Sequence, residues 1–331
     1  MAATEDGAPV EWCKLRGADR PSGELAMNAY LAAPDPQPTY VAKLDQLLGG
    51  GMSRGLFVLG GPPSCGKSVL ACQAAALMCD RGRRVMYASY EMSWEVVQLR
   101  CASAWSCQYH VQQRYGVRPF SWADVFNGSE RRRHPEYAGL SRGELGQYLI
   151  REHMDPVAYA LTRWDEGPGR NLAVMCGGYD VHELCDVASS VEGEPPILIV
   201  DYLQIVPSGA AQEQSEYQRV TEVVNALQAH AYSGNGGHVM ALSSTRNLTA
   251  ADYKDGPSLS WYRGSGYVGF AAEQAAMIVT DRRKDDESGQ YVPSLSQDGR
   301  TEGHMTMVKN KSGASGQSIA TLMAGWCNLI E

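Results

Sequence analysis

Residues 61–68 read Gly61-Pro62-Pro63-Ser64-Cys65-Gly66-Lys67-Ser68 and match the pattern G-x-x-x-x-G-K-[ST]. This octapeptide follows an apolar run, Leu56-Phe57-Val58-Leu59, which predicts a strand, and it precedes a helix-forming run over residues 69–77. A strand, a glycine-rich loop and a helix in that order are the context in which this pattern binds phosphate. The alternative is a glycine turn that only caps a helix, but the flanking elements favour the phosphate loop.

The residue types in the loop suit this chemistry. Gly61 and Gly66 allow backbone angles that point successive N–H groups into one anion-binding concavity. The helix that begins at Lys67 adds the positive end of its dipole. Lys67 would reach the β- and γ-phosphates of a nucleotide, and Ser68 would bind Mg²⁺. The remaining loop residues that we expect to line the nucleotide are Pro62, Ser64 and Cys65.

Composition narrows the classes of protein. The chain has 331 residues, 44% of them hydrophobic, and a net charge of −8, which argues against a protein that coats nucleic acid in bulk. Its nine cysteines form no C-x-x-C pair, and spacings such as Cys72/Cys79 do not fit zinc. No apolar stretch approaches 18 residues and no signal peptide is visible. We expect a reduced, soluble, cytoplasmic protein without membrane contact, whose cysteines are mostly core residues.

Strand and helix signals alternate along most of the chain. Residues 1–40 read as an N-terminal extension with a proline-rich linker near its end, and residues 41–331 read as one domain. Helices are expected over residues 69–77, after Ser93, and near residues 181–191. The expected strands are residues 56–59, 85–89, 172–175, 197–200, 238–242, 277–280, 304–308 and 318–323. Continuous apolar strands between helices predict an α/β fold with a mostly parallel sheet covered on both faces.

Residues 104–170 interrupt this alternation. They carry nine Arg against eight acidic residues and include Trp105, Trp122 and Trp164, an aromatic content too high for a disordered loop. We expect a helical insertion packed on the core. The alternative is a nucleic-acid or partner surface built on Arg131-Arg132-Arg133-His134. Charge runs are more often solvated faces, which favours the packed insertion.

A second nucleotide motif lies at residues 197–201, which read Ile-Leu-Ile-Val-Asp. An apolar strand that ends in a carboxylate is the Walker B strand of phosphate-loop ATPases, and its Asp supports Mg²⁺ directly or through water. The pattern alone is weak, but a phosphate loop upstream makes it specific. We therefore assign Asp201 to the nucleotide site and, with Ser68, to the metal.

Several segments together resemble the motor domain of DnaB-type replicative helicases. They occur in the family's order and, with the phosphate loop, cover residues 41–331. The matching segments are residues 44–51, which resemble the start of the family's core; residues 89–93 with 98–100, which resemble its S-L-E-M segment; residues 200–205, which resemble D-Y-L-Q; residues 263–266 with 272–273, which resemble R-x-S-G…A-D; and residues 309–313, which resemble K-x-R-N-G. The resemblance implies a RecA-like core that binds and hydrolyses ATP with Mg²⁺.

The resemblance also assigns roles to single residues. Glu91 would be the general base or water-orienting carboxylate, although an acid at a helix N-terminus is a common dipole partner. Arg263, with the backbone at Gly264 and Gly266, would hold the phosphates of single-stranded DNA; the alternative is an ordinary glycine turn with one arginine. Lys309 and Lys311 would reach the γ-phosphate of a neighbouring subunit's nucleotide; the alternative is an exposed hairpin with two lysines.

The sequence departs from the family at four places. Lys311 stands where the family has an arginine finger, and lysine offers a point charge rather than a bidentate fork. The family's sensor glutamine falls at Ser244, and Arg246 nearby is a candidate substitute. The loop at residues 207–215 has no Lys or Arg, so a second DNA contact is not expected there. The 40 residues before the core are too few for the family's helical N-terminal domain.

The function implied by the resemblance is an ATP-dependent helicase motor that acts on single-stranded DNA as a ring, a hexamer in the family, in DNA replication. A loader or other replication protein is a further expected partner. One alternative is a RecA-type ATPase of repair or of plasmid or phage replication, which binds or loads on DNA without unwinding it. Another is a nucleotide-dependent regulatory or binding module. Hydrolysis stimulated by DNA separates the motor from the module.

Overall fold

The computed structural model describes residues 27, 35–122, 139–141, 144, 156–210, 214–233, 237–264, 266–284, 291–324 and 329–330. The chain divides into two units, Met1–Asp35 and Pro36–Glu331. All of the helices and strands named below lie in the second unit. The Arg131-Arg132-Arg133-His134 cluster falls outside the described residues, and so do residues 1–26 of the predicted extension.

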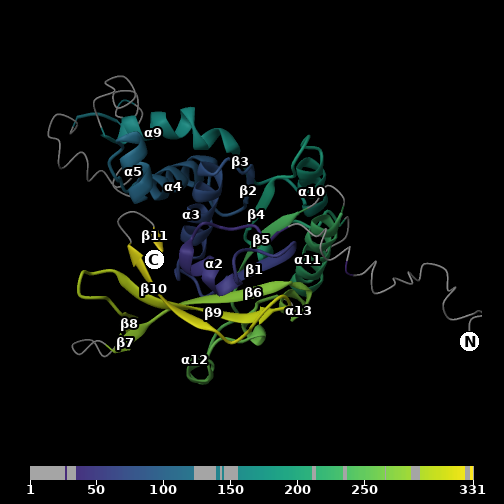
Figure 1. The fold of residues 1–331 in the computed structure, drawn as a ribbon. Helices are drawn as coiled ribbons and strands as arrows, with labels where there is room; N and C mark the ends of the chain where they lie inside the picture. The colour runs from purple at the N-terminus through teal and green to yellow at the C-terminus, as the bar shows by residue number, and fades with distance from the viewer. Residues whose placement is uncertain are drawn as a thin grey trace, which may run out of the picture. The chain divides into compact units, whose positions relative to one another are not determined.

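A nine-stranded sheet organises the second unit, with the strand order β11-β10-β9-β6-β1-β5-β4-β2-β3 (Figure 1). Neighbouring strands from β6 to β3 run parallel, whereas β9, β10 and β11 are antiparallel to their neighbours. The strands are β1 Gly55–Gly61, β2 Val85–Ser89, β3 Leu172–Cys176, β4 Ile197–Asp201, β5 His238–Ser244, β6 Gln274–Thr280, β9 Thr301–Asn310, β10 Ser318–Ala324 and β11 Leu329–Ile330. A separate hairpin pairs β7 Arg282–Lys284 with β8 Tyr291–Pro293.

The antiparallel edge has a simple cause. β9 and β10 are joined by residues 311–317 alone, and so short a connection can return a strand only in the opposite direction. The parallel strands are instead separated by helices or longer segments. The predicted mostly parallel sheet is therefore present, with an antiparallel extension at one edge.

Helices cover both faces of the sheet (Figure 1). One face carries α3 and α4, and the other carries α10, α11 and α13. The helices are α2 Ala42–Leu48, α3 Lys67–Asp80, α4 Trp94–Ser106, α5 Tyr109–Tyr115, α9 Pro156–Glu166, α10 Val181–Ser189, α11 Glu216–Tyr232, α12 Ala250–Asp255 and α13 Tyr267–Ala271, with single 3-10 turns η3 Pro168–Asn171, η4 Leu203–Ile205 and η5 Leu259–Trp261.

Alternate side chains of strand β1 pack into two hydrophobic clusters, one on each face of the sheet. Leu56 and Val58 point into the cluster beneath α11, while Phe57 and Leu59 point into the cluster beneath α3. Alternate side chains of a strand lie on opposite faces, so a strand covered on both sides must be apolar throughout. All seven residues of β1 are buried, which explains its continuous apolar run.

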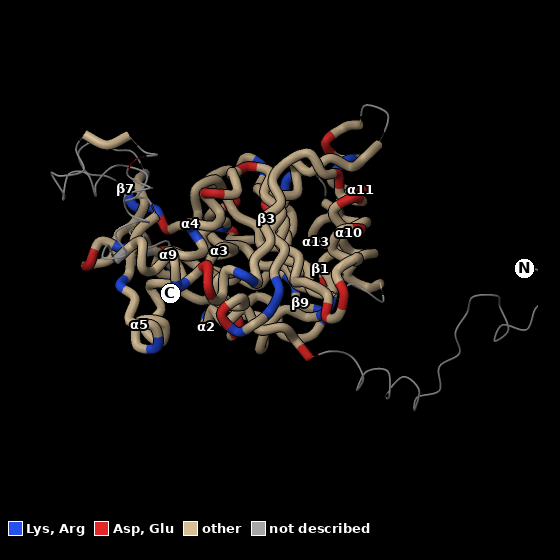
Figure 2. The backbone as a smooth tube through the Cα atoms, turned by 90° about the horizontal axis from the view of Figure 1, so that it is seen from above, with Lys and Arg blue, Asp and Glu red and all other residues tan. Residues whose placement is uncertain are grey.

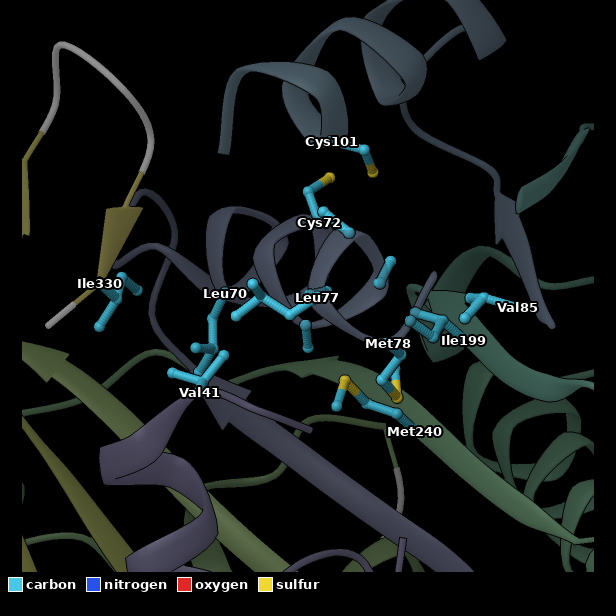
Figure 3. Close-up of a cluster of buried hydrophobic side chains, with 14 of the residues drawn as sticks. Val41, Leu70, Cys72, Leu77, Met78, Val85, Cys101, Ile199, Met240 and Ile330 are labelled. Carbon is cyan, nitrogen blue, oxygen red and sulfur yellow. The ribbon is translucent and has the colours of Figure 1, made fainter. Parts of the chain in front are cut away.

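Helix α3 is enclosed on every side. Residues 70–79 are all buried because α3 lies between the sheet and α4 (Figure 3). In that view Cys72 of α3 faces Cys101 of α4, while Leu77 and Met78 lie closer to the sheet. A helix that carries the phosphate loop at its N-terminus is thus held by packing around its whole circumference.

Two helices within residues 104–170, α5 and α9, pack on α4. Trp105 of α4 lies 5.8 Å from Trp164 of α9 and 5.3 Å from Tyr115 of α5, measured between ring centroids. The hydroxyl of Tyr159 donates to the carbonyl of Tyr115 at 3.0 Å. Helix α4 continues through Ser106, so the first residues of the segment belong to a core helix. The boundaries of the insertion stay a prediction.

The described backbone carries both charge signs. Acidic and basic positions are interspersed over it in the view of Figure 2. Over the same residues, no helix combines the length and the apolar character that crossing a membrane requires.

Candidate nucleotide-binding site

A cleft of about 670 Å³ opens at the carboxyl ends of the central parallel strands. It is lined by Lys67 and Ser68 of the phosphate loop, Glu91 after β2, Asp201 at the end of β4, Ser244 at the end of β5, and Arg263. Ligands of open parallel sheets bind at this edge, where loops after different strands converge. The cleft therefore brings together six residues that the sequence singled out separately.

The phosphate loop uses its two glycines for different reasons. Gly66 has a φ of +98°, in the region where a side chain is strained. Gly61 has no such φ; a Cβ there would lie 2.5 Å from the carbonyl oxygen of Ile278. The expectation that both glycines serve backbone angles is thus wrong for Gly61, which is required by close packing against β6. Side chains of Met323 and Ile330, from β10 and β11, lie just beneath Gly66.

Lys67 lies folded across the loop. Its Nζ donates to the carbonyl oxygens of Gly61 and Pro62, at 2.8 Å each. Cys65 is 5% exposed and turns its thiol inward, and burial raises the pKa of that thiol. Only the backbone of Cys65 can therefore face a ligand, whereas Lys67 holds an ammonium that could exchange carbonyl oxygens for phosphate oxygens.

Asp201 is buried at the floor of the cleft. Burial raises the pKa of Asp201, and the hydrogen bonds from Ser68 and Tyr87 act in the opposite direction. Tyr87 Oη donates to Asp201 Oδ2 at 2.9 Å. A serine hydroxyl and a carboxylate are hard oxygen donors, and Mg²⁺ is usually held by one or two such groups together with phosphate oxygens. Ser68 and Asp201 therefore fit the predicted metal.

Glu91 stands in the turn between β2 and α4. Ser89 closes this turn by accepting from the backbone N–H of Met92 at 3.0 Å and donating to its carbonyl at 2.7 Å. The N–H of Tyr90 donates to the backbone carbonyl of Asp201 at 2.8 Å, which ties the turn to β4. Glu91 is exposed and lies outside α4, whose first-turn acid is Glu95. This placement favours a group that faces the cleft over a partner of the helix dipole.

Gln204 links the end of β5 to the segment that carries Arg263. Its Oε1 accepts from the N–H of Ser244 at 3.1 Å, and its Nε2 donates to Ser243 Oγ and to the carbonyl of Arg263, at 2.9 Å each. Ser244 pairs in register with Gly61 of β1, so this network begins beside the phosphate loop. Arg246 also lines the cleft, but its guanidinium is paired with both carboxylate oxygens of Asp252 at 2.5 and 3.0 Å.

Arg263 lines the same cleft as the phosphate loop. Its Nε lies 2.9 Å from Glu216 Oε1 of α11, and its backbone N–H donates to the carbonyl of Ser244 at 3.0 Å. Gly264 has a φ of +88° and would place a Cβ 3.0 Å from Val220, so glycine is required there. Gly266 has open space around it and no such need.

Lys309 and Lys311 lie at the other end of the sheet. Lys309 Nζ donates to the carbonyls of Gly269 and Phe270, and Lys311 Nζ lies 2.5 Å from Glu273 Oε1. The N–H of Glu273 donates to Leu56 O, near the start of β1, whereas the phosphate loop follows the end of β1. At ~3.3 Å per strand residue these points are about 17 Å apart. Lys311 therefore cannot act on the cleft of its own chain, and Lys309, level with Val58 across β6, is held by the carbonyls of Gly269 and Phe270.

Three residues of the site were not predicted. Arg100 lines the cleft and places its guanidinium 4.4 Å from the ring centroid of Trp122. Tyr87 contacts Asp201, and Gln204 contacts Ser244, as described above. Arg100 and Gln204 lie inside segments used for the resemblance, which is a signal that could have drawn attention to them. Tyr87 reads as an ordinary strand residue and gives no such signal.

Comparison with known proteins supports the resemblance. The sequence model of the DnaB-like helicase C terminal domain matches residues 37–117. A DNA repair protein RadA of Brucella abortus is 43% identical over 61 residues, which make up 18% of this chain and 13% of that protein. A DNA repair protein RadA of Mycobacterium tuberculosis is 38% identical over 81 residues, 24% of this chain and 17% of its own length. The matches thus span less than a fifth of these relatives.

Two solved structures share the fold over nearly the whole chain. One is an isolated ATPase domain, which superposes with a TM-score of 0.67 at 16% identity, covering 94% of this chain and 99% of that domain. The other is a DnaB-like replicative helicase, from a study of that helicase and its interactions with primase. It also superposes with a TM-score of 0.67 at 16% identity, covering 95% of this chain and 67% of the helicase. They confirm the predicted RecA-like fold class. The chain therefore matches the DnaB-like helicase C terminal domain in sequence over residues 37–117, and over nearly its whole length it shares the RecA-like fold of these two structures.

Proposed function

We propose that this protein is a Mg²⁺-dependent ATPase whose cleft binds ATP and whose turnover drives movement on single-stranded DNA. The observation that carries the proposal is the convergence of Lys67, Ser68, Glu91 and Asp201 on one cleft from three separate segments. Phosphoryl transfer asks a protein mainly for positioning and charge stabilisation, and these four groups supply both.

Each group has a separate task in this proposal. Backbone N–H groups of the phosphate loop and Lys67 bind the β- and γ-phosphates, and Lys67 gives up its two carbonyl partners when it does so. Ser68 and Asp201 hold the metal, which neutralises charge on the phosphate oxygens when bound. Glu91, exposed at the cleft, orients the attacking water and accepts its proton.

The second half of the site comes from another copy of the chain. Because Lys311 lies at the far end of the sheet, it can supply charge only to a neighbour's nucleotide. A head-to-tail contact of this kind closes into a ring or runs on as a filament. We propose a ring, a hexamer as the resemblance implies, with Arg263 contacting DNA. A role in DNA replication, with a loader as partner, rests on the resemblance alone.

A nucleotide-dependent binding module is the alternative that a specific contact favours. Arg263 is already neutralised by Glu216, so its charge is not free for DNA in this conformation. If that pair persists, ATP would set assembly or binding without a DNA motor.

The experiment is the ATPase rate of the full chain with and without single-stranded DNA, across a salt series. The motor requires DNA-stimulated hydrolysis, and affinity for DNA should fall with salt as counterions are released. Arg263→Ala should lower DNA affinity and DNA stimulation together by several fold, while basal hydrolysis persists. Slow hydrolysis that DNA leaves unchanged would support the binding module instead, and unchanged affinity in Arg263→Ala would place the DNA contact elsewhere.

A further inference from the structure

Tyr87 of β2 lies beneath the cleft and touches its metal-binding carboxylate. Its side chain is fully buried, and its Oη donates to Asp201 Oδ2 at 2.9 Å. The thiol of Cys72, on α3, lies 3.8 Å from the same hydroxyl. Figure 3 shows Cys72 facing Cys101 of α4 in the packed layer above the sheet. A polar hydroxyl therefore reaches the site from within an apolar layer.

The strand pairing explains why Tyr87 reaches Asp201. β2 and β4 are parallel neighbours, with Tyr87 opposite Ile199 and Ser89 opposite Asp201. The Tyr87 side chain is long enough to cover the two-residue offset and meet the carboxylate from below. Ser68, at the start of α3, is a neighbour of the same carboxylate and lowers its pKa. The hydroxyl of Tyr87 therefore holds Oδ2 from β2, while Ser68 belongs to α3.

A second buried tyrosine gives a useful contrast. The hydroxyl of Tyr262 lies 3.2 Å from the backbone carbonyl oxygens of Val58 and Ala276. It satisfies the hydrogen-bonding need of a buried phenol with backbone groups alone. Tyr87 satisfies the same need with the one carboxylate that the site requires for its metal. The two residues are alike in burial but differ in what their hydroxyls hold.

We propose that Tyr87 is a positioning residue for the nucleotide's Mg²⁺, an inference that rests on the proposed function. By occupying Oδ2, the Tyr87 hydroxyl fixes the Asp201 side chain and leaves Oδ1, with Ser68, to meet the metal and its water. Groups that orient a metal ligand in this way commonly change metal affinity 10–100-fold when they are removed. Tyr87 is not among the residues that line the cleft, so its effect should be confined to the metal.

The test measures metal dependence apart from catalysis. A fluorescent ADP analogue is bound to the full-length wild type, Tyr87→Phe and Tyr262→Phe, first in EDTA and then over a series of free Mg²⁺ concentrations. In EDTA all three should bind the analogue within about twofold of one another. In the titration Tyr87→Phe should need about tenfold more Mg²⁺ for half of the Mg²⁺-induced change. Tyr262→Phe should match the wild type in Mg²⁺ dependence, even if it melts at a lower temperature.

The outcomes separate this inference from the proposed function. If the wild type does not bind the analogue, the proposed function fails and this inference fails with it. If the wild type depends on Mg²⁺ and Tyr87→Phe shows the same half-saturating concentration, this inference alone is overturned. Should Tyr87→Phe not fold, Tyr87→Ile also lacks the hydroxyl, retains an apolar side chain suited to a strand, and gives the same test.

Discussion

Charged side chains have different surroundings at the two ends of the central sheet. At the carboxyl ends of β1 and β4, Lys67, Glu91 and Asp201 face one open cleft. Near the start of β1, Lys311 is paired with Glu273, and Lys309 is held by backbone carbonyls. At the cleft end the charged groups share one cavity, where Lys67 is held by two loop carbonyls, whereas at the other end Lys311 is neutralised by a carboxylate of its own chain.

The difference bears on which parts of the reaction one chain can perform alone. Phosphate binding, metal binding and water activation draw on groups that already share a cleft. Charge donated by Lys311 must reach a phosphate some distance beyond its own chain, and it must first leave Glu273. We therefore expect single changes at the cleft end to abolish steps outright, and changes at the Lys311 end to act through assembly.

The largest effect is expected from Lys67→Ala. Loss of the loop ammonium removes the contact to the β- and γ-phosphates, so hydrolysis should fall by at least about a hundredfold. The side chain is half-buried and its ammonium is held by loop carbonyls rather than by the apolar core, so the melting temperature should stay near that of the wild type. A phosphate-release assay with a parallel melting curve measures both. Turnover close to wild type would refute the assignment of the cleft.

Glu91→Gln should separate binding from chemistry. The amide keeps the size of the side chain but cannot accept a proton, so turnover should fall roughly 10²–10³-fold. The phosphate and metal contacts stay, so equilibrium binding of ATP should be unchanged. Glu95→Gln is the matched control, because Glu95 is an exposed acid in the first turn of α4. Equal turnover in Glu91→Gln and Glu95→Gln would reduce Glu91 to a surface acid.

Lys311 variants should affect turnover more mildly. Lysine supplies one charge but not the two parallel hydrogen bonds of an arginine, so basal turnover should already be slow. Lys311→Ala should lower the rate by about tenfold, below the 10³–10⁵ attributed to arginine fingers, with ATP affinity kept. Lys311→Arg should preserve or raise the rate. The comparison is made at a protein concentration where the wild type assembles, and a rate in Lys311→Ala equal to wild type would exclude the residue.

The smallest effect on turnover is expected at His238, which begins β5 at the end of the sheet away from the cleft. Burial, with Arg83 and Arg54 nearby, lowers the pKa of His238 to about 4 from 6.5. Between these values the unfolded chain binds the proton and the folded chain does not. Stability is therefore full above pH 6.5 and falls as the pH drops toward 4, by up to about 3 kcal/mol.

Denaturant unfolding between pH 4 and 8 measures this dependence. His238→Gln should flatten this dependence over that window. A His238→Gln protein whose stability still falls with the wild-type slope would show that another group carries the dependence.

Sequence patterns predict most strands of the sheet but not the contacts between side chains of the site. The eight expected strands all fall within observed ones. The fully buried strands β1, β2 and β4 are the easiest to recognise, because a strand covered on both faces is a continuous apolar run. The longest helix, α11, was not predicted, although Ser215 and Gln218 form a capping box and Val220, Val224 and Leu227 line one face. Both the cap and the apolar face are local signals that the sequence itself carries.

The contacts within the site could not be read from the sequence. Tyr87 meets Asp201 only because β2 pairs with β4, and nothing local to either strand specifies that pairing. The position of Lys311 depends likewise on β9 pairing antiparallel to β6. Motifs name the residues that face a ligand, whereas strand order decides which neighbours hold them in place.

The most direct test of a site shared between copies is a mixing experiment. Lys67→Ala and Lys311→Ala proteins, each assayed alone, should hydrolyse ATP slowly, the first because its cleft is damaged and the second because it cannot assist a neighbour. In a mixture, an intact cleft of a Lys311→Ala copy can receive Lys311 from a Lys67→Ala copy. We predict that turnover in an equimolar mixture exceeds the mean of the two separate rates and rises with protein concentration. The account would be contradicted by two results together. The mixture would hydrolyse ATP at the mean of the two separate rates at every protein concentration, and the wild type would remain monomeric with ATP, Mg²⁺ and DNA while hydrolysing ATP at its full rate.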